Sequence, residues 1–433
     1  MKKTVLIIIL TIISALFIFY RFIEIPKYLA YDEVEFTKLA LSLDNKPYAP
    51  YSQLATGHST LYFYILLASL KTFGINVFAL RFPAAIFGIL SVLFFYLIMK
   101  KVFKQSNNET MKQFLPFFLT FILLSSRWFL NFARFSFEAT FLLFLELTSI
   151  YFLIKFEEKQ KVKIPNLFAP ACRQAGFNVF RQKISVSSFD IMLSGLFASL
   201  AFNSYTPGRI FFLLPIGFLL FRKRLNNETM KQLLLFLIPF VIVITPLTSY
   251  LLNNKDTRID QQFFLRNHEM TVNEKVNGLW SNVSSTTLML FTKGDMNGRH
   301  NYPGKPALNP ILGILFIVGL AITMKQWNNG ANKLFLIYFF LSIFPALMTY
   351  PWENPNMLRT YTVIPAIVYF IGLSISEIFK ITKQKYLWLI IIIIVFSSFY
   401  ELRTYFKYQS TVFNQSFEIK LPLEKAIKVK TLL

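Results

Sequence analysis

The fold is decided at residues 4–20, where the chain reads TVLIIILTIISALFIFY without one charged residue. A run of this length can cross the hydrocarbon core of a bilayer as a helix. Similar runs recur as far as residue 400. The chain is 55% hydrophobic and only 15% charged, whereas soluble domains average about 25% charged residues. These features predict an all-α polytopic membrane protein.

Positive charge is the second marked feature, because the formal net charge is +23. Lys and Arg gather just after apolar runs, as at residues 100–104 and 222–224, and this pattern sets membrane topology and attracts anionic lipids. We therefore expect membrane lipids as partners and no nucleic acid. The first run lacks a small-residue cleavage site and is interpreted as a retained anchor. The single cysteine, Cys172, excludes an internal disulfide.

The basic clusters predict a cytoplasmic N-terminus and about 11 transmembrane helices in the plasma membrane. The expected helices are 4–20, 78–99, 114–131, 137–155, 189–206, 208–221, 233–252, 308–324, 334–350, 361–379 and 386–400. Residues 21–77 and 253–307 are long outer loops in this scheme, and 60–73 is interfacial or re-entrant because it is too short to span. Residues 156–188 form a cytoplasmic insertion.

Residues 1–400 are therefore expected to form one transmembrane domain, followed by an extracytoplasmic tail at 401–433. The heptapeptide NNETMKQ occurs at 107–113 and 226–232, and both copies fall on the cytoplasmic side. The basic residues of the tail leave open an even helix count, with the tail inside.

The outer loops hold the polar residues that suit chemistry. Asp32 and Glu33 follow the first apolar run, and paired carboxylates at a membrane surface suit general-base catalysis. Cationic residues lie in three outer loops, at His58, at Arg299 with His300, and at Arg359. Guanidinium groups bind phosphate in a bidentate manner, so these residues are candidates for a phosphate site. Pairing of the cations with Asp295 or Glu353 between loops is the structural alternative.

Two acids accompany the helix expected at 137–155. Glu138 lies at its outer end, four residues after Arg134, and suits a cavity that opens outward. Glu146 lies deeper and is expected to form a hydrogen bond between helices. The histidines lack any metal-ligand spacing, so no metal site is assigned, although a divalent metal beside the carboxylates stays open.

Several segments resemble one family when they are taken in order. They are YDE at 31–33, GHSTLYFY at 57–64, ALRFPAAIFG at 79–88, GDMNGRHNYPGKP at 294–306 and NPNMLRTYTVIP at 354–365. The sequence resembles the GT-C membrane glycosyltransferases of the protein O-mannosyltransferase and aminoarabinose-transferase type, glycosyltransferase family 39. Prolines that the family often has beside its first-loop histidine or lysine are missing at Ser59 and Thr60.

The resemblance implies transfer of a sugar from a polyprenyl-phosphate-linked donor at the extracytoplasmic face. The acceptor is a protein, a lipid or a glycan. The family's catalytic acid falls on Asp32, with Glu33 beside it, and its second acid falls on Glu138. Asp32 would act as the general base of an inverting displacement. The leaving phosphate would be stabilised by the cationic candidates His58, Arg134, Arg299, His300 and Arg359.

Two other functions remain open from the sequence. One is a transporter or flippase of lipid-linked sugars, and the other is a non-catalytic protein of the same fold. Transporters place ionisable groups near the membrane midplane and often contain repeated halves. Here the charges gather in outer loops, and no halves match.

Overall fold

The computed structural model describes residues 3–105, 109–161, 173–222, 227–254, 256–382 and 387–429. Cys172 and the adjoining part of the predicted insertion, residues 162–172, lie outside these ranges. The described chain is a helical bundle with one short antiparallel ladder, formed by β1 (Tyr51–Ser52) and β2 (His58–Ser59).

The helices in chain order are α1 (Lys3–Phe19), α2 (Tyr31–Ser42), α3 (Leu61–Phe73), α4 (Val77–Val102), α5 (Glu109–Ser125), α6 (Arg127–Ala133), α7 (Glu138–Lys161), α8 (Arg173–Phe202), α9 (Leu213–Arg222), α10 (Asn227–Asn253), α11 (Thr257–Gln262), α12 (Val272–Phe291), α13 (Pro310–Lys325), α14 (Gly330–Leu347), α15 (Ile364–Ile381), α16 (Leu387–Arg403), α17 (Ser410–Ser416) and α18 (Leu423–Ala426). Each of the 11 predicted transmembrane segments coincides with one or two of these helices. The prediction of an all-α polytopic membrane protein is therefore confirmed.

Length and composition divide the apolar helices into two groups. In the described ranges, six helices are long and apolar enough to cross a membrane, and the number is seven if the bent pair α5 and α6 counts as one span. The shorter apolar helices include α1, α3, α9 and α13. The count of about 11 spans is thus approximate, since several predicted spans are shorter than a bilayer requires.

The helix predicted at 114–131 is bent in the structure. The chain bends by 64° between α5 and α6, where Ser126 adopts extended backbone angles. Polar residues of α6 explain the break, because they form hydrogen bonds with distant loops. Arg127 pairs with Glu401 at 2.5 Å, and Asn131 donates to the carbonyl of Arg299 at 2.8 Å.

Two predicted loops contain helices of their own, and the last helix extends beyond its predicted end. The outer loop at 253–307 includes α11 and the 20-residue α12. The first loop includes α2 and α3. The last helix does not end at residue 400 but continues through a π-helical turn, Thr404–Gln409, into α17.

Close helix packing depends on glycine at two positions. A Cβ atom on Gly195 of α8 would come within 2.2 Å of the Phe236 carbonyl oxygen of α10. A Cβ atom on Gly319 of α13 would come within 1.8 Å of the Phe370 carbonyl oxygen of α15. Because neither contact is possible for a larger residue, glycine lets these backbones approach.

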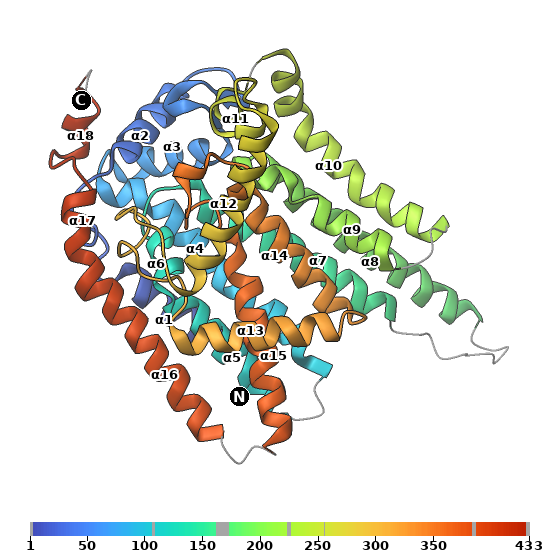
Figure 1. Cartoon of the computed structure of the whole chain (residues 1–433). Coiled ribbons are helices and arrows are strands. Elements are labelled where there is room, and N and C mark those ends of the chain that lie inside the picture. Colours follow the sequence, from blue (N-terminus) through green and yellow to red (C-terminus); the bar gives the residue numbers. More distant parts are fainter. Residues whose placement is uncertain are drawn as a thin grey trace.

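The ends of the bundle differ in the elements that they carry. α2, α3, α11 and α18 gather at one end, whereas the C-terminal end of α15 and the N-terminal end of α16 lie at the other (Figure 1). An antiparallel bridge between Leu29 and Ile419 joins the C-terminal tail to the first loop. The tail therefore lies at the same end of the bundle as the first loop.

Candidate active site

Asp32 and Glu33 lie in the first turn of α2. The backbone N–H of Ala30 donates to Glu33 Oε2 at 3.2 Å and so helps to define where the helix begins. Acidic residues are favoured in a first helical turn, because the N-terminal end of a helix carries partial positive charge. Adjacent helical residues point about 100° apart, so the two acids face different surroundings.

Glu33 faces the protein core. It is fully buried and forms a bidentate pair with Arg81 of α4, with both nitrogen–oxygen distances at 2.8 Å. Arg81 also donates to the carbonyls of Pro26 and Tyr28, at 2.6 and 2.8 Å. The predicted catalytic role of Glu33 therefore finds no support in its placement, which instead fixes α2 against α4.

Asp32 faces a cavity of about 570 Å³. The cavity is lined by residues from the three loops that were predicted to be outer, together with residues of α11. Its polar and charged lining includes Asp32, Glu35, His58, Arg258, Gln262, Asp295, Asn297, Arg299, His300, Glu353, Asn354, Asn356 and Arg359. Segments far apart in sequence thus meet at one site, which we call the polar cavity.

Arg299 is the partner of Asp32 in the polar cavity. Its Nη1 lies 2.7 Å from Asp32 Oδ2, and the Asp32 side chain is 41% exposed. His300 turns instead to Asp295, with its Nδ1 2.9 Å from Asp295 Oδ2. The same carboxylate accepts the backbone N–H of Met357 at 2.8 Å. Asp295 and His300 therefore tie two loops together, which is the structural alternative considered for this histidine.

Arg359 combines a structural pair with a free group. One terminal nitrogen pairs with Glu353, as the structural alternative anticipated. The other, Nη1, is buried and has no hydrogen-bond partner among the described residues. A buried guanidinium nitrogen without a partner is costly, so the site suits an anionic ligand that accepts a hydrogen bond from it.

Glu138 does not line the polar cavity itself but contacts His58, which does. Its Oε1 lies 2.5 Å from His58 Nδ1, and both side chains are buried. Arg258 Nη1 lies 2.8 and 2.7 Å from the two ring nitrogens of His58, and its guanidinium lies over the ring of Tyr205 at 5.3 Å. His58 and Glu138 are thus placed to hold Arg258, rather than to contact a substrate independently.

Arg134 lies away from the polar cavity. Its guanidinium donates to backbone carbonyls of Phe17, Ile18, Arg21 and Ile25, at distances between 2.6 and 3.1 Å. Phe17 and Ile18 lie in the last turn of α1, and Arg21 and Ile25 follow it, so Arg134 holds the end of this helix. The predicted phosphate role of Arg134 is therefore not supported by its placement. Glu146 accepts from Tyr338 of α14 at 2.8 Å, as expected for a bond between helices.

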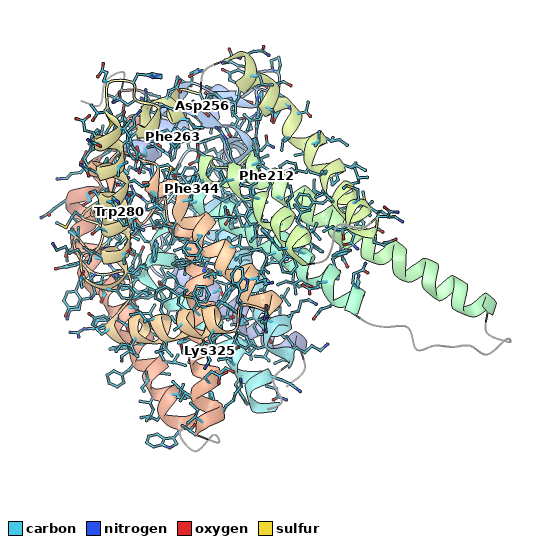
Figure 2. The ribbon with its side chains drawn as sticks, turned by 45° about the vertical axis from the view of Figure 1, so that its right-hand side comes forward. Phe212, Asp256, Phe263, Trp280, Lys325 and Phe344 are labelled. Carbon is cyan, nitrogen blue, oxygen red and sulfur yellow. The ribbon has the colours of Figure 1, made fainter. Side chains whose placement is uncertain are left out.

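An apolar groove of about 310 Å³ adjoins the polar cavity. It is bounded by the 3-10 turn Thr206–Ile210, by α11 with the residues after it, and by the C-terminal end of α14. Figure 2 labels two of its aromatic residues, Phe263 and Phe344. Four residues, Tyr205, Arg258, Gln262 and Arg359, line both the groove and the polar cavity.

Arg258 is the main residue that sequence reasoning missed. It stands in an ordinary polar stretch after α10 that matches no motif. The N-terminus of α11 positions it, because Asp256 accepts the backbone N–H groups of Arg258 and Ile259 at 3.1 and 3.2 Å. Although burial by itself raises the pKa of Asp256, its ion pair with Arg209 holds that pKa below the ordinary value.

No metal site is evident in the described ranges. Within them, no group of three or more His, Cys, Asp or Glu side chains is placed to hold a metal ion.

The buried His58 ring should make stability depend on pH. Burial lowers its pKa, the Arg258 charge acts in the same direction, and Glu138 opposes both. In the unfolded chain, the His58 ring is protonated as pH falls through about 6.5, whereas in the folded chain it is protonated only at a lower pH. Stability is therefore expected to fall as pH drops below about 6.5, by up to ~1.4 kcal/mol per pH unit.

The measurement is the thermal midpoint of the protein in detergent between pH 5 and 8. The His58→Gln variant should show a flatter profile in this range. His268→Gln is the matched control, because His268 is exposed. Equal slopes for wild type and His58→Gln would contradict the prediction.

Two solved structures are similar to the chain over most of its length. ArnT from Cupriavidus metallidurans, in a crystal structure bound to undecaprenyl phosphate, has a TM-score of 0.52 and 11% identity, covering 86% of this chain and 60% of ArnT. The archaeal oligosaccharyltransferase AglB from Archaeoglobus fulgidus, in complex with an inhibitory peptide and a dolichol-phosphate, has a TM-score of 0.51 and 12% identity, covering 96% and 56%. The chain thus spans less than two thirds of either protein.

The neighbours define the class of the fold. Both are GT-C membrane enzymes, so the bundle described here is a GT-C fold, as the motifs predicted. Residues 57–173 match the family described as dolichyl-phosphate-mannose-protein mannosyltransferase. The resemblance to glycosyltransferase family 39 is therefore confirmed over that range, which includes His58 and Glu138 but not Asp32. No curated protein matches the chain.

Proposed function

We propose that this protein transfers a sugar from a polyprenyl-phosphate-linked donor to a hydroxyl group of a protein, lipid or glycan. The observation that carries the proposal is the junction of the apolar groove with the polar cavity. A lipid-linked sugar has an apolar chain, a phosphate and a polar ring in that order. Groove, arginines and cavity follow one another in the same order, with Arg258 and Arg359 between the two spaces.

The neighbours support the nature of the donor. ArnT was solved with undecaprenyl phosphate, and AglB was solved with a dolichol-phosphate and a peptide. Both lipids carry a phosphate on a polyprenyl chain. We infer the same donor type here, since an amphipathic phosphate fits the two spaces that Arg258 and Arg359 separate.

Asp32 is proposed as the general base. Its carboxylate takes the proton of the acceptor hydroxyl while the hydroxyl oxygen forms a bond to the anomeric carbon. The bond from that carbon to the phosphate oxygen breaks, and polyprenyl phosphate leaves with the electron pair. One displacement of this kind inverts the anomeric configuration. Arg299, at 2.7 Å, orients the Asp32 carboxylate.

Arg258 and Arg359 are proposed to stabilise the leaving phosphate. Negative charge builds on that phosphate as the glycosidic bond breaks, and preorganised cations favour the transition state. His58 and Glu138 act as positioning residues for Arg258. Arg299 and His300, predicted from the sequence as phosphate ligands, are engaged by Asp32 and Asp295.

The site is proposed to lie on the extracytoplasmic face of the plasma membrane. The support is the positive-inside pattern of the basic clusters. The end of the bundle that carries the polar cavity also holds the first loop and the C-terminal tail.

Radiolabelled polyprenyl-phosphate sugars supplied to the purified protein in proteoliposomes test the function. Release of polyprenyl phosphate together with labelled acceptor supports transfer. Movement of intact donor across the bilayer without cleavage would identify a flippase instead. Absence of both activities with a broad donor panel would indicate a non-catalytic protein.

Removal of either phosphate contact should weaken catalysis strongly. A charge-assisted hydrogen bond contributes roughly 1.5–3 kcal/mol, so Arg258→Ala and Arg359→Ala should each lower kcat/KM for the donor about ten- to a hundredfold. Arg359→Lys should also be impaired, because a point charge does not replace the planar guanidinium. Initial rates at varied donor concentration provide the measurement.

Arg403→Ala is the control for loss of a positive charge, because Arg403 lies outside both spaces and its guanidinium lies over Tyr408. It should leave donor kinetics unchanged. Wild-type kinetics in the double variant Arg258→Ala/Arg359→Ala would show that the phosphate binds elsewhere.

A further inference from the structure

Four tryptophans of the described chain are exposed, Trp280, Trp327, Trp352 and Trp388, and of these Trp352 alone lines the polar cavity. Trp352 is 77% exposed and belongs to the cavity wall. Trp280 is 69% exposed on α12 and lies at the edge of the molecule in Figure 2. An indole buries a large apolar area when it can, so an exposed tryptophan inside a polar site calls for an explanation.

Trp352 is held rigidly. Its ring stacks on Tyr350, with the centroids 4.3 Å apart and the planes at 21°. The Tyr350 hydroxyl accepts from Asn267 at 3.1 Å. Asn354 donates to Asn282 and to the carbonyl of Ala346, both at 2.8 Å, which fixes the 3-10 turn Pro351–Glu353. Tyr350 thus covers one face of the indole and leaves the opposite face open.

Polar groups around the indole face the same space. Gln262, Asn297 and Asn356 line the cavity with Trp352. The amide oxygens of Asn297 and Asn356 accept backbone N–H groups of their own loops, at 3.0 and 3.1 Å. Their amide nitrogens and the whole Gln262 amide have no hydrogen-bond partner among the described residues. A rigid aromatic face is therefore combined with free amide groups.

We propose that Trp352 is the platform for a pyranose ring in the polar cavity. This inference rests on the proposed function. One face of a pyranose carries C–H groups, which are weakly positive and suit the negative face of an indole. Its edge carries hydroxyls, which both donate and accept hydrogen bonds and so match amide side chains. The ring belongs to the donor or to a glycan acceptor.

A membrane anchor is the competing role for an exposed tryptophan, because indoles favour the interface. Trp280 is exposed to a similar extent as Trp352 but does not line the polar cavity, so it is the matched control. Trp352→Phe keeps an aromatic face, whereas Trp352→Ala removes it. Trp280→Ala removes an exposed indole outside the cavity, so the three variants separate ring stacking from anchoring.

Binding is measured in lipid nanodiscs with three probes. They are undecaprenyl phosphate without a sugar, undecaprenyl phosphate carrying mannose or glucose, and free methyl mannoside or glucoside. If the ring belongs to the donor, Trp352→Ala should lower the affinity for the sugar-bearing lipid about three- to tenfold. The affinity for the sugar-free lipid should not change. If it is the acceptor's, the loss should appear with the methyl glycosides. Trp352→Phe should keep most of the affinity.

Other outcomes overturn the inference. If Trp352→Ala lowered the affinity for both lipids equally, Trp352 would have an anchoring or structural role. Wild-type affinity in every arm would exclude a sugar platform, and a matching loss in Trp280→Ala would point to the interface. If the wild-type protein does not bind even sugar-free undecaprenyl phosphate, the proposed donor fails rather than the role of Trp352.

Discussion

Replacing Asp32 by Asn is expected to lower turnover about 10²- to 10⁴-fold, the range that general-base catalysis contributes. Asparagine has nearly the same shape and keeps an oxygen that can accept from Arg299. It cannot take a proton from the acceptor hydroxyl. The loss should therefore fall on kcat, while the affinity for the donor and the thermal midpoint stay near wild type.

Asp260 provides a matched control for this change. It also pairs with an arginine, Arg266, at 3.1 Å, and its side chain is 44% exposed, close to the value for Asp32. It does not line the polar cavity. Asp260→Asn should retain wild-type turnover. Turnover within a fewfold of wild type in the Asp32→Asn variant would remove Asp32 from the mechanism and direct attention to Glu35, the other carboxylate of α2 in the cavity wall.

The sequence predicted the helices well because lipid imposes a strong rule. Each spanning segment must satisfy its backbone hydrogen bonds internally and present apolar side chains. Runs such as 78–99 and 361–379 meet that rule and appear as α4 and α15. The bend at Ser126 escaped prediction, because the apolar run continues through it. Its cause lies in bonds from Arg127 and Asn131 to loops distant in sequence.

The site was predictable only in part, for a related reason. Motifs placed Asp32, Arg299 and Arg359 in outer loops, and these loops do meet. Neighbouring residues such as Asp32 and Glu33 look alike in sequence, yet one faces a cavity and the other an arginine in the core. Arg134 and Arg258 differ in the same way, since the first caps α1 and the second lies between the two spaces. Only the packing of α4, α7 and α11 decides such assignments.

The second large effect is expected from breaking the buried Glu33–Arg81 pair. Removal of one partner of a buried ion pair typically costs about 3–5 kcal/mol, because the remaining charge loses its counterion without gaining water. Arg81→Ala should lower the free energy of unfolding by that amount. It also deprives the carbonyls of Pro26 and Tyr28 of their donor. Reversible unfolding in mixed detergent micelles measures the change.

An exposed ion pair, Lys71 with Asp44, provides the control for the buried pair. Lys71→Ala removes one partner of an exposed pair with Asp44, which should cost at most about 1 kcal/mol. Replacing both buried partners, as in Glu33→Met/Arg81→Met, should recover part of the stability lost in Arg81→Ala, since no unpaired charge remains. Because Arg81 fixes the helix that carries Asp32, Arg81→Ala should lose turnover together with stability, whereas Asp32→Asn should lose turnover alone. A stable Arg81→Ala variant with normal turnover would show that α2 is positioned by its apolar contacts.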